Sequence, residues 1–71
     1  MSTENRLRVL RAERRINQWD TAKAAGISEN RYWRIEAGRT TPDAAERRAL
    51  AKVFGVRVTD VFPKSDSRVV A

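Results

Sequence analysis

The chain contains no cysteine and no histidine. Disulfide frameworks are therefore excluded, as are metal sites built on thiolate or imidazole ligands. No apolar run approaches the roughly 20 residues that a membrane-spanning helix needs. The first ten residues also lack the apolar centre of a signal peptide. We therefore expect a cytoplasmic protein that holds no metal and no cofactor.

Catalytic groupings are missing as well. No glycine-rich phosphate-binding loop follows a predicted strand, and no nucleophile has a base at a recognisable spacing. Each of the nine carboxylates has an explanation as a helix cap, an ion-pair partner or a surface charge. We predict that the protein is not an enzyme.

Acidic residues are few compared with basic ones: 15 lysines and arginines stand against 9 aspartates and glutamates, a formal net charge of +6. The sequence pI of about 11.1 favours a polyanionic partner. The alternative is a soluble basic protein with no such partner, since charge alone is a weak signal. With 71 residues the chain forms one small domain with a thin margin of stability.

The most informative stretch is 18–36, which predicts a helix, a sharp turn and a second helix. Gly26 stands where a helix ends in the left-handed conformation, and Ser28 can cap the helix that follows. In that second helix, Tyr32 and Ile35 share one side by helical spacing. The opposite side carries polar groups and an indole, and it is predicted to face outward.

The outward side chains can read the edges of base pairs in a DNA major groove. Asn30 can bond adenine in two places, Arg34 can bond guanine in two places, and Glu29 can accept from cytosine N4. We predict base contacts by Ser28, Glu29, Asn30, Trp33 and Arg34, with the reading helix over 28–37. For Glu29, the alternative is that its charge only complements the positive end of the helix. For Trp33, the contact is either a thymine methyl or a sugar.

These residues resemble the helix-turn-helix of the phage repressor/Cro family, the xenobiotic-response-element type of bacterial regulators. The matching positions are Gln18, Ala22, Gly26, Ile27, Ser28, Ile35, Glu36, Gly38, Pro42, Leu50-Ala51-Lys52, Gly55-Val56 and Asp60-Val61-Phe62. The resemblance implies an all-α, five-helix, lambda-repressor-like DNA-binding domain. We assign residues 1–62 to this domain and residues 63–71 to a tail.

The resemblance also implies contacts to the DNA backbone, at the start of the second helix and in the loop after the third. They fall on Asn17, Gln18, Arg39, Thr40 and Thr41. Asn17 is equally plausible as a simple helix cap. Arg31 reaches either phosphate or solvent, and we include it among the backbone contacts.

One further pair is structural. In the family, an arginine at the position of Arg11 pairs with the glutamate that matches Glu36. A guanidinium beside the core needs such a carboxylate, because an unpaired buried charge is unfavourable. We therefore predict an Arg11–Glu36 ion pair.

The remaining helices follow from periodicity and caps. The first helix should run to about Arg14, and the fourth should run from near Asp43 to Phe54. A last short helix is predicted over Asp60 to Phe62, with Thr59 as its cap.

Four side chains raise particular questions. Arg15 stands where the family usually has glycine, so a left-handed backbone there would be strained. Thr21 replaces the usual leucine, and we expect Trp19 to supply the lost apolar volume through burial, with a DNA-backbone contact as the alternative. Tyr32 is predicted to be core, with its hydroxyl at the edge.

The apolar residues near the end of the chain suggest a homodimer contact through Val58, Val61 and Phe62, with the tail as a possible addition. The alternative is that these three residues only close the core of the monomer.

Together these features predict a sequence-specific transcriptional regulator, a repressor or small autoregulator, whose partner is double-stranded DNA. One alternative is a protein-interaction module such as an antitoxin. Another is a DNA-bending protein of the excisionase type. RNA is a poorer partner, because its major groove is too deep and narrow for a helix.

Overall fold

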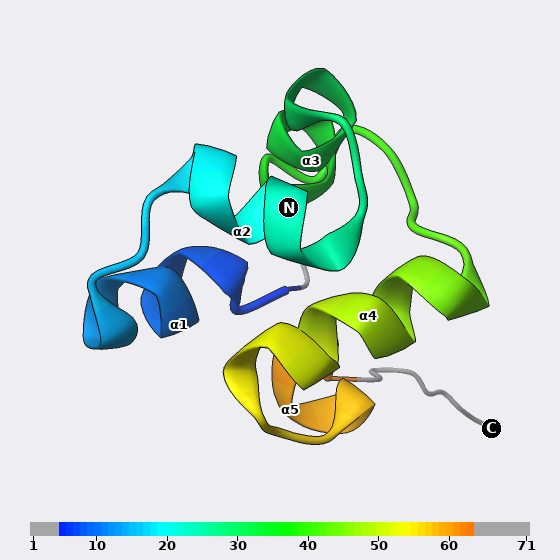
Figure 1. Cartoon of the computed structure of the whole chain (residues 1–71). Coiled ribbons are helices and arrows are strands. Elements are labelled where there is room, and N and C mark those ends of the chain that lie inside the picture. Colours follow the sequence, from blue (N-terminus) through cyan, green and yellow to red (C-terminus); the bar gives the residue numbers. More distant parts are fainter. Residues whose placement is uncertain (1–4, 64–71) are drawn as a thin grey trace, which may run out of the picture.

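Local sequence signals set most of the helix ends in this computed structural model, which describes residues 5–63. Within that range the chain forms five α-helices and no strand (Figure 1). They are α1 (Leu7–Arg14), α2 (Gln18–Ala25), α3 (Glu29–Glu36), α4 (Ala44–Phe54) and α5 (Val58–Val61). The predicted all-α, five-helix fold is confirmed. Apart from Pro63, the predicted tail lies outside the described residues.

Three helices begin with a side-chain cap. The side chain of Asn17 accepts from the backbone N–H of Asp20 at 2.7 Å, and Ser28 Oγ accepts from that of Arg31 at 3.2 Å. Asp43 and Glu46 form a reciprocal capping box, in which each side chain accepts from the other's backbone N–H. These bonds satisfy backbone donors that would otherwise be free at the start of each helix.

The last helix differs from the prediction at its start. It begins at Val58, so Thr59 lies inside it and is not the cap. The backbone N–H of Arg57 instead donates to the Asp60 carboxylate at 3.0 Å. A carboxylate is a stronger acceptor than a threonine hydroxyl, and this bond moves the start of the helix towards the N-terminus.

The core gathers side chains from all five helices. In space, α2 packs against both α3 and α4, and α4 packs against α5 (Figure 1). The segment before α1 is tied to the last helix, since the Arg6 N–H donates to the Val61 carbonyl at 2.8 Å. Buried apolar residues are Leu7, Leu10, Ala22, Ile27, Tyr32, Ile35, Leu50, Ala51, Phe54 and Val61.

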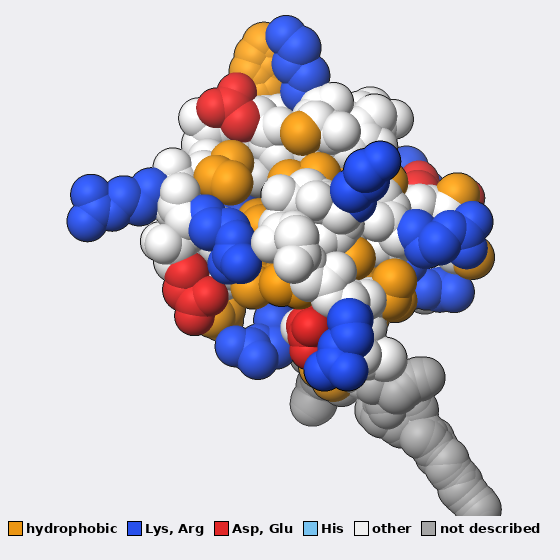
Figure 2. Space-filling model, turned by 60° about the horizontal axis from the view of Figure 1, so that its bottom comes forward, with side chains coloured by type: hydrophobic (Ala, Val, Ile, Leu, Met, Phe, Trp, Pro, Cys, Tyr) orange, Lys and Arg blue, Asp and Glu red, His pale blue; other side chains and the backbone are white. Residues whose placement is uncertain are grey.

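Val61 was predicted to lie on a dimer surface, and that part of the prediction is wrong. Its side chain is fully buried because the four-residue α5 folds back onto α4. Val58 and Phe62 are partly buried against the same core. Figure 2 brings the α5 end of the molecule forward and shows apolar side chains as separate spots between polar and basic ones.

The burial expected for Trp19 is also wrong, because its side chain is 52% exposed. Thr21 fills the core position itself and is fully buried. Its hydroxyl donates to the Asn17 carbonyl at 2.9 Å, so burial leaves no unpaired polar group. Trp19 is therefore not needed for the core, and Lys23 lies over its ring, 6.0 Å from the centroid.

Arg15 adopts the left-handed conformation, with φ of 56°. Replacing it with glycine is expected to raise the free energy of unfolding by roughly 0.5–1 kcal/mol. Glycine removes the strain of a Cβ in this conformation, about 1–2 kcal/mol. It also raises the conformational entropy of the unfolded state, and this offsets part of the gain in stability. Urea unfolding measures the change. Arg15→Ala keeps the Cβ and serves as the control; an equal gain in both variants would rule out backbone strain as the cause.

Candidate DNA-binding surface

The turn between α2 and α3 fixes the direction of α3. Gly26 is left-handed, with φ of 73°, and the N–H of the next residue, Ile27, donates to the Ala22 carbonyl at 2.9 Å. Ile27 is buried and anchors the turn to the core. On α3, Tyr32 and Ile35 are fully buried, so the opposite side of this helix must face outward.

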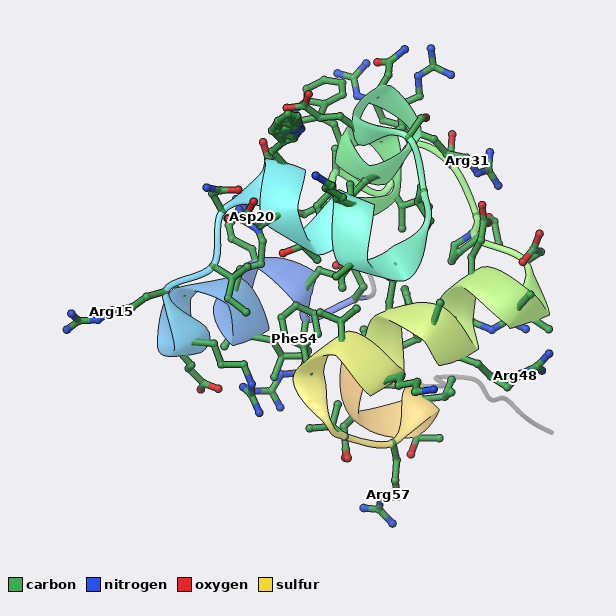
Figure 3. The ribbon with its side chains drawn as sticks, viewed as in Figure 1. Arg15, Asp20, Arg31, Arg48, Phe54 and Arg57 are labelled. Atoms are coloured by element: carbon green, nitrogen blue, oxygen red, sulfur yellow. The ribbon has the colours of Figure 1, made fainter. Side chains whose placement is uncertain are left out.

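That outward side carries Glu29, Asn30, Trp33 and Arg34, all of them exposed. The side chains of Glu29, Asn30 and Arg34 make no hydrogen bond or ion pair with any residue of the described range 5–63. Side chains ending in nitrogen project from the outer end of α3, away from the rest of the molecule (Figure 3). Four of the predicted DNA contacts, Gln18, Glu29, Asn30 and Trp33, line an open hollow of about 290 Å³. The fold therefore brings the start of α2 and the first turns of α3 to one surface.

The loop after α3 lies beside this surface. The Arg39 N–H donates to the Arg34 carbonyl at 2.8 Å, and the Arg39 guanidinium lies over the Trp33 ring, 5.5 Å from its centroid. A cation over an indole face is an attractive contact of modest strength. Arg39 and Thr41 are exposed, and Thr40 is partly exposed. The contact over Trp33 gives the loop a fixed position relative to the reading helix.

Besides Asn17, whose side chain caps α2, two predicted backbone contacts already have partners within the protein. The Gln18 amide donates to Glu36 Oε1 at 3.3 Å. Arg31 forms a two-bond ion pair with Glu46: Nε–Oε2 is 2.5 Å and Nη2–Oε1 is 2.8 Å. Sequence reasoning did not identify Glu46 as a structural residue. The Asp43-x-x-Glu46 spacing of a capping box could have revealed its structural role.

Glu36 stands at the centre of a network that joins α1, α2 and α3. Its side chain is 2% exposed. Arg11 donates to it twice, from Nε to Oε1 at 3.1 Å and from Nη2 to Oε2 at 2.7 Å. Arg8 adds a weaker contact from the surface, with Nε 3.5 Å from Oε2. The Arg11–Glu36 geometry is thus that of an ion pair which ties the reading helix to α1.

The hydroxyl of Tyr32 is buried beside this pair, not at the edge of the core as predicted. Burial raises the pKa of Tyr32, and the negative charge of Glu36 raises it further. Burial by itself would raise the pKa of Glu36, but the hydrogen bonds from Arg11 and Gln18 outweigh it and hold that pKa below its usual value. Glu36 is therefore ionised at neutral pH.

Acid is expected to weaken the fold through the carboxylates whose pKa is lowered. The Arg31 hydrogen bonds, followed by the Asp43 N–H, lower the pKa of Glu46 from 4.5 to about 2. A depressed pKa contributes stability above the unfolded-state value, and this stability is lost as pH falls towards the folded-state value. The free energy of unfolding, measured with urea, should therefore decrease as the pH falls from roughly 5 to 2.

Glu46→Gln tests the origin of this effect. The variant should lose less stability than the wild type over that acid range, because its residue 46 no longer takes up a proton. An identical pH dependence in the two proteins would assign the acid sensitivity to other carboxylates, Glu36 first among them.

Charge alone does not identify the DNA-binding face. Basic side chains are spread across the view of Figure 2, and Arg15, Arg48 and Arg57 project in three different directions (Figure 3). No helix of residues 5–63 is long and apolar enough to cross a bilayer. In the same range, no group of three His, Cys, Asp or Glu side chains could hold a metal ion. The unpaired polar side chains of α3 are therefore the feature that singles out one surface.

Comparison with known proteins agrees with this geometry. The model of the helix-turn-helix domain family matches residues 5–61, which span all five helices. This chain belongs to the helix-turn-helix regulators.

Among the similar members of this family is the transcriptional repressor RstR of a cryptic CTXphi phage in Vibrio cholerae, 31% identical over 92% of the chain. An uncharacterised HTH-type transcriptional regulator of Methanocaldococcus jannaschii is 35% identical over 89% of the chain. The HTH-type transcriptional regulator DdrOP3 of Deinococcus deserti is 41% identical over 80%.

The share of each relative's length that this helix-turn-helix chain covers varies widely. It covers 96% of the archaeal regulator, but 59% of the phage repressor and 44% of the Deinococcus regulator. The similarity therefore concerns the helix-turn-helix unit in all three cases, and the full length of only the archaeal protein.

Proposed function

We propose that this helix-turn-helix regulator binds double-stranded DNA in a sequence-specific manner and acts as a repressor or small autoregulator by occupying an operator. The observation that carries the proposal is the outward side of α3, where Glu29, Asn30 and Arg34 are exposed and have no partner among the described residues. The names of the relatives, a repressor and two transcriptional regulators, support the same role. Such a protein would act in the cytoplasm, in contact with the chromosome.

Base reading is assigned to the first two turns of α3. An α-helix fits the major groove, and each base pair presents a distinct set of donors and acceptors there. Asn30 and Arg34 offer two-bond contacts to adenine and guanine, and Glu29 offers an acceptor to cytosine. Ser28 and Trp33 complete the proposed set, with the indole placed for an apolar contact to a thymine methyl or a sugar.

Backbone binding is assigned to the two segments that flank α3. Asn17 and Gln18 lie at the start of α2, where free N–H groups and the helix dipole favour a phosphate. Arg39, Thr40 and Thr41 lie in the loop after α3. Since phosphate binding releases counterions, affinity should fall with salt, by a slope of about 0.9 for each phosphate neutralised.

A homodimer on a near-palindromic operator is part of the proposal. Its two reading helices would lie about 34 Å apart, one turn of DNA. Of the three residues first considered for the contact, Val58 and Phe62 retain partial exposure. A mass measurement of the free and DNA-bound protein tests this part separately from DNA binding itself.

Selection of bound sites from a random pool of DNA duplexes tests the main proposal. We expect one enriched motif, with half-sites about one helical turn apart if two copies bind. Glu29→Ala/Asn30→Ala/Arg34→Ala, which removes only exposed groups, should fold normally and lose the motif. A pool that shows no enrichment at low ionic strength would overturn the proposal, and so would an unchanged motif with the triple variant.

A further inference from the structure

The loop that follows α3 is held at both of its ends. At its beginning, the Arg39 N–H is bonded to the Arg34 carbonyl and the Arg39 guanidinium lies on Trp33. At its other end, the Glu46 carboxylate accepts from the Asp43 N–H at 2.9 Å. The proposed backbone-binding residues Arg39, Thr40 and Thr41 lie between these two anchors.

The second anchor is bonded directly to the reading helix. Arg31 of α3 and Glu46 of α4 form a two-bond pair, and Glu46 Oε1 receives both the Arg31 Nη2 and the Asp43 N–H. In Figure 3 the Arg31 side chain extends from α3 along the side on which the loop descends to α4. Glu46 is mostly shielded, with 17% of its side chain exposed, against 41% for Arg31.

Arg47 strengthens the same end of the loop. Its Nη1 donates to the Pro42 carbonyl at 2.9 Å, which ties the last turn of the loop to α4. Among the described residues, the Arg31–Glu46 pair is the ion pair that joins α3 to α4, and it lies at this end of the loop. A two-bond arginine–carboxylate contact fixes an orientation as well as a distance.

We propose that Arg31 and Glu46 are positioning residues for DNA binding: they set the distance between the reading helix and the loop 38–42, and Arg31 does not bind phosphate. The assignment replaces the phosphate contact predicted for Arg31 from the sequence. A guanidinium whose charge is already balanced by a carboxylate has little net charge with which to displace counterions from DNA. The inference rests on the proposed DNA-binding function.

The two roles of Arg31 predict opposite effects for Glu46→Gln. If the pair positions the loop, this variant weakens binding, although it makes the protein more positive. If Arg31 binds phosphate, the same variant releases its charge and tightens binding. The sign of the change therefore separates the two roles.

The experiment compares wild type, Arg31→Met, Glu46→Gln and the double variant on the selected operator across a range of salt concentrations. Each single variant should bind about 5-fold or more weaker, and the double variant should be no weaker than the worse single one, since both remove one shared interaction. The salt slope of Arg31→Met should match that of the control Arg48→Met. Arg48 is an exposed arginine on α4, so this control reports the general effect of losing one positive charge.

Urea unfolding of every variant shows that the binding constants refer to folded protein. Three outcomes overturn the inference: tighter or unchanged binding with Glu46→Gln, additive losses in the double variant, or a salt slope for Arg31→Met about one below that of Arg48→Met. Wild-type protein that binds no duplex would instead refute the proposed function, which is a separate result.

Discussion

Arg11→Met is expected to lower the free energy of unfolding by about 3–5 kcal/mol, because it leaves the Glu36 carboxylate buried without its main partner. That carboxylate is 2% exposed and receives two hydrogen bonds from Arg11. A domain of this size has a total stability of only several kcal/mol, so the variant should be largely unfolded near physiological temperature. Urea unfolding followed by far-ultraviolet circular dichroism measures the loss.

Arg8→Met is the matched control for this prediction. Arg8 approaches the same carboxylate at 3.5 Å, but its side chain is 78% exposed. Solvent screens such a surface contact, so the control should change stability by less than about 1 kcal/mol. Equal losses in the two variants would contradict the view that burial of the Arg11–Glu36 pair is what matters. Adding Glu36→Gln to Arg11→Met should recover part of the loss, since it removes the stranded charge.

Arg34→Ala is expected to weaken binding to the selected operator by about 1–3 kcal/mol, roughly 5- to 150-fold, and to relax base preference at one position. The reason is that the Arg34 guanidinium is exposed on α3. Within the described residues it makes no hydrogen bond or ion pair that would compete with a contact to a base. Binding to a random duplex should fall much less. Equilibrium titration of both duplexes, with the operator varied at each position, measures the two effects.

Arg48→Ala controls for the loss of one positive charge. This residue extends from α4 rather than from the reading helix (Figure 3). Its replacement should weaken binding to operator DNA and to random DNA by the same small factor. If Arg34→Ala also weakened binding to both duplexes equally, Arg34 would be a phosphate contact. The base preference would then have to come from the other residues of α3.

The reading helix illustrates what sequence reasoning can achieve in this chain. Ser28 caps it, Gly26 ends the helix before it, and the spacing of Tyr32 and Ile35 sets its buried side. All of these signals act within one or two helical turns. They were therefore readable without knowing what the helix packs against, and the exposed set that includes Asn30 and Arg34 followed from them.

The errors have a common origin in contacts between distant residues. Trp19 was expected to be buried, yet it is Thr21 that the packing of the helices buries in the core. Val61 was expected at a surface, yet α5 folds onto α4 and buries it. Periodicity states that a residue lies on an apolar stripe, but not whether another helix covers that stripe.

The sequence by itself determined the five helices, most of their caps and the polar character of one side of α3, because these depend on residues a few positions apart. Apart from the Arg11–Glu36 pair, which the family resemblance implied, only the tertiary structure decided which charged and polar side chains pair with one another. Arg31 and Glu46 are fifteen positions apart and Gln18 and Glu36 eighteen, and both pairs meet because helices pack together. That packing decides which polar groups are occupied inside the protein and which, such as Asn30 and Arg34, remain free for DNA.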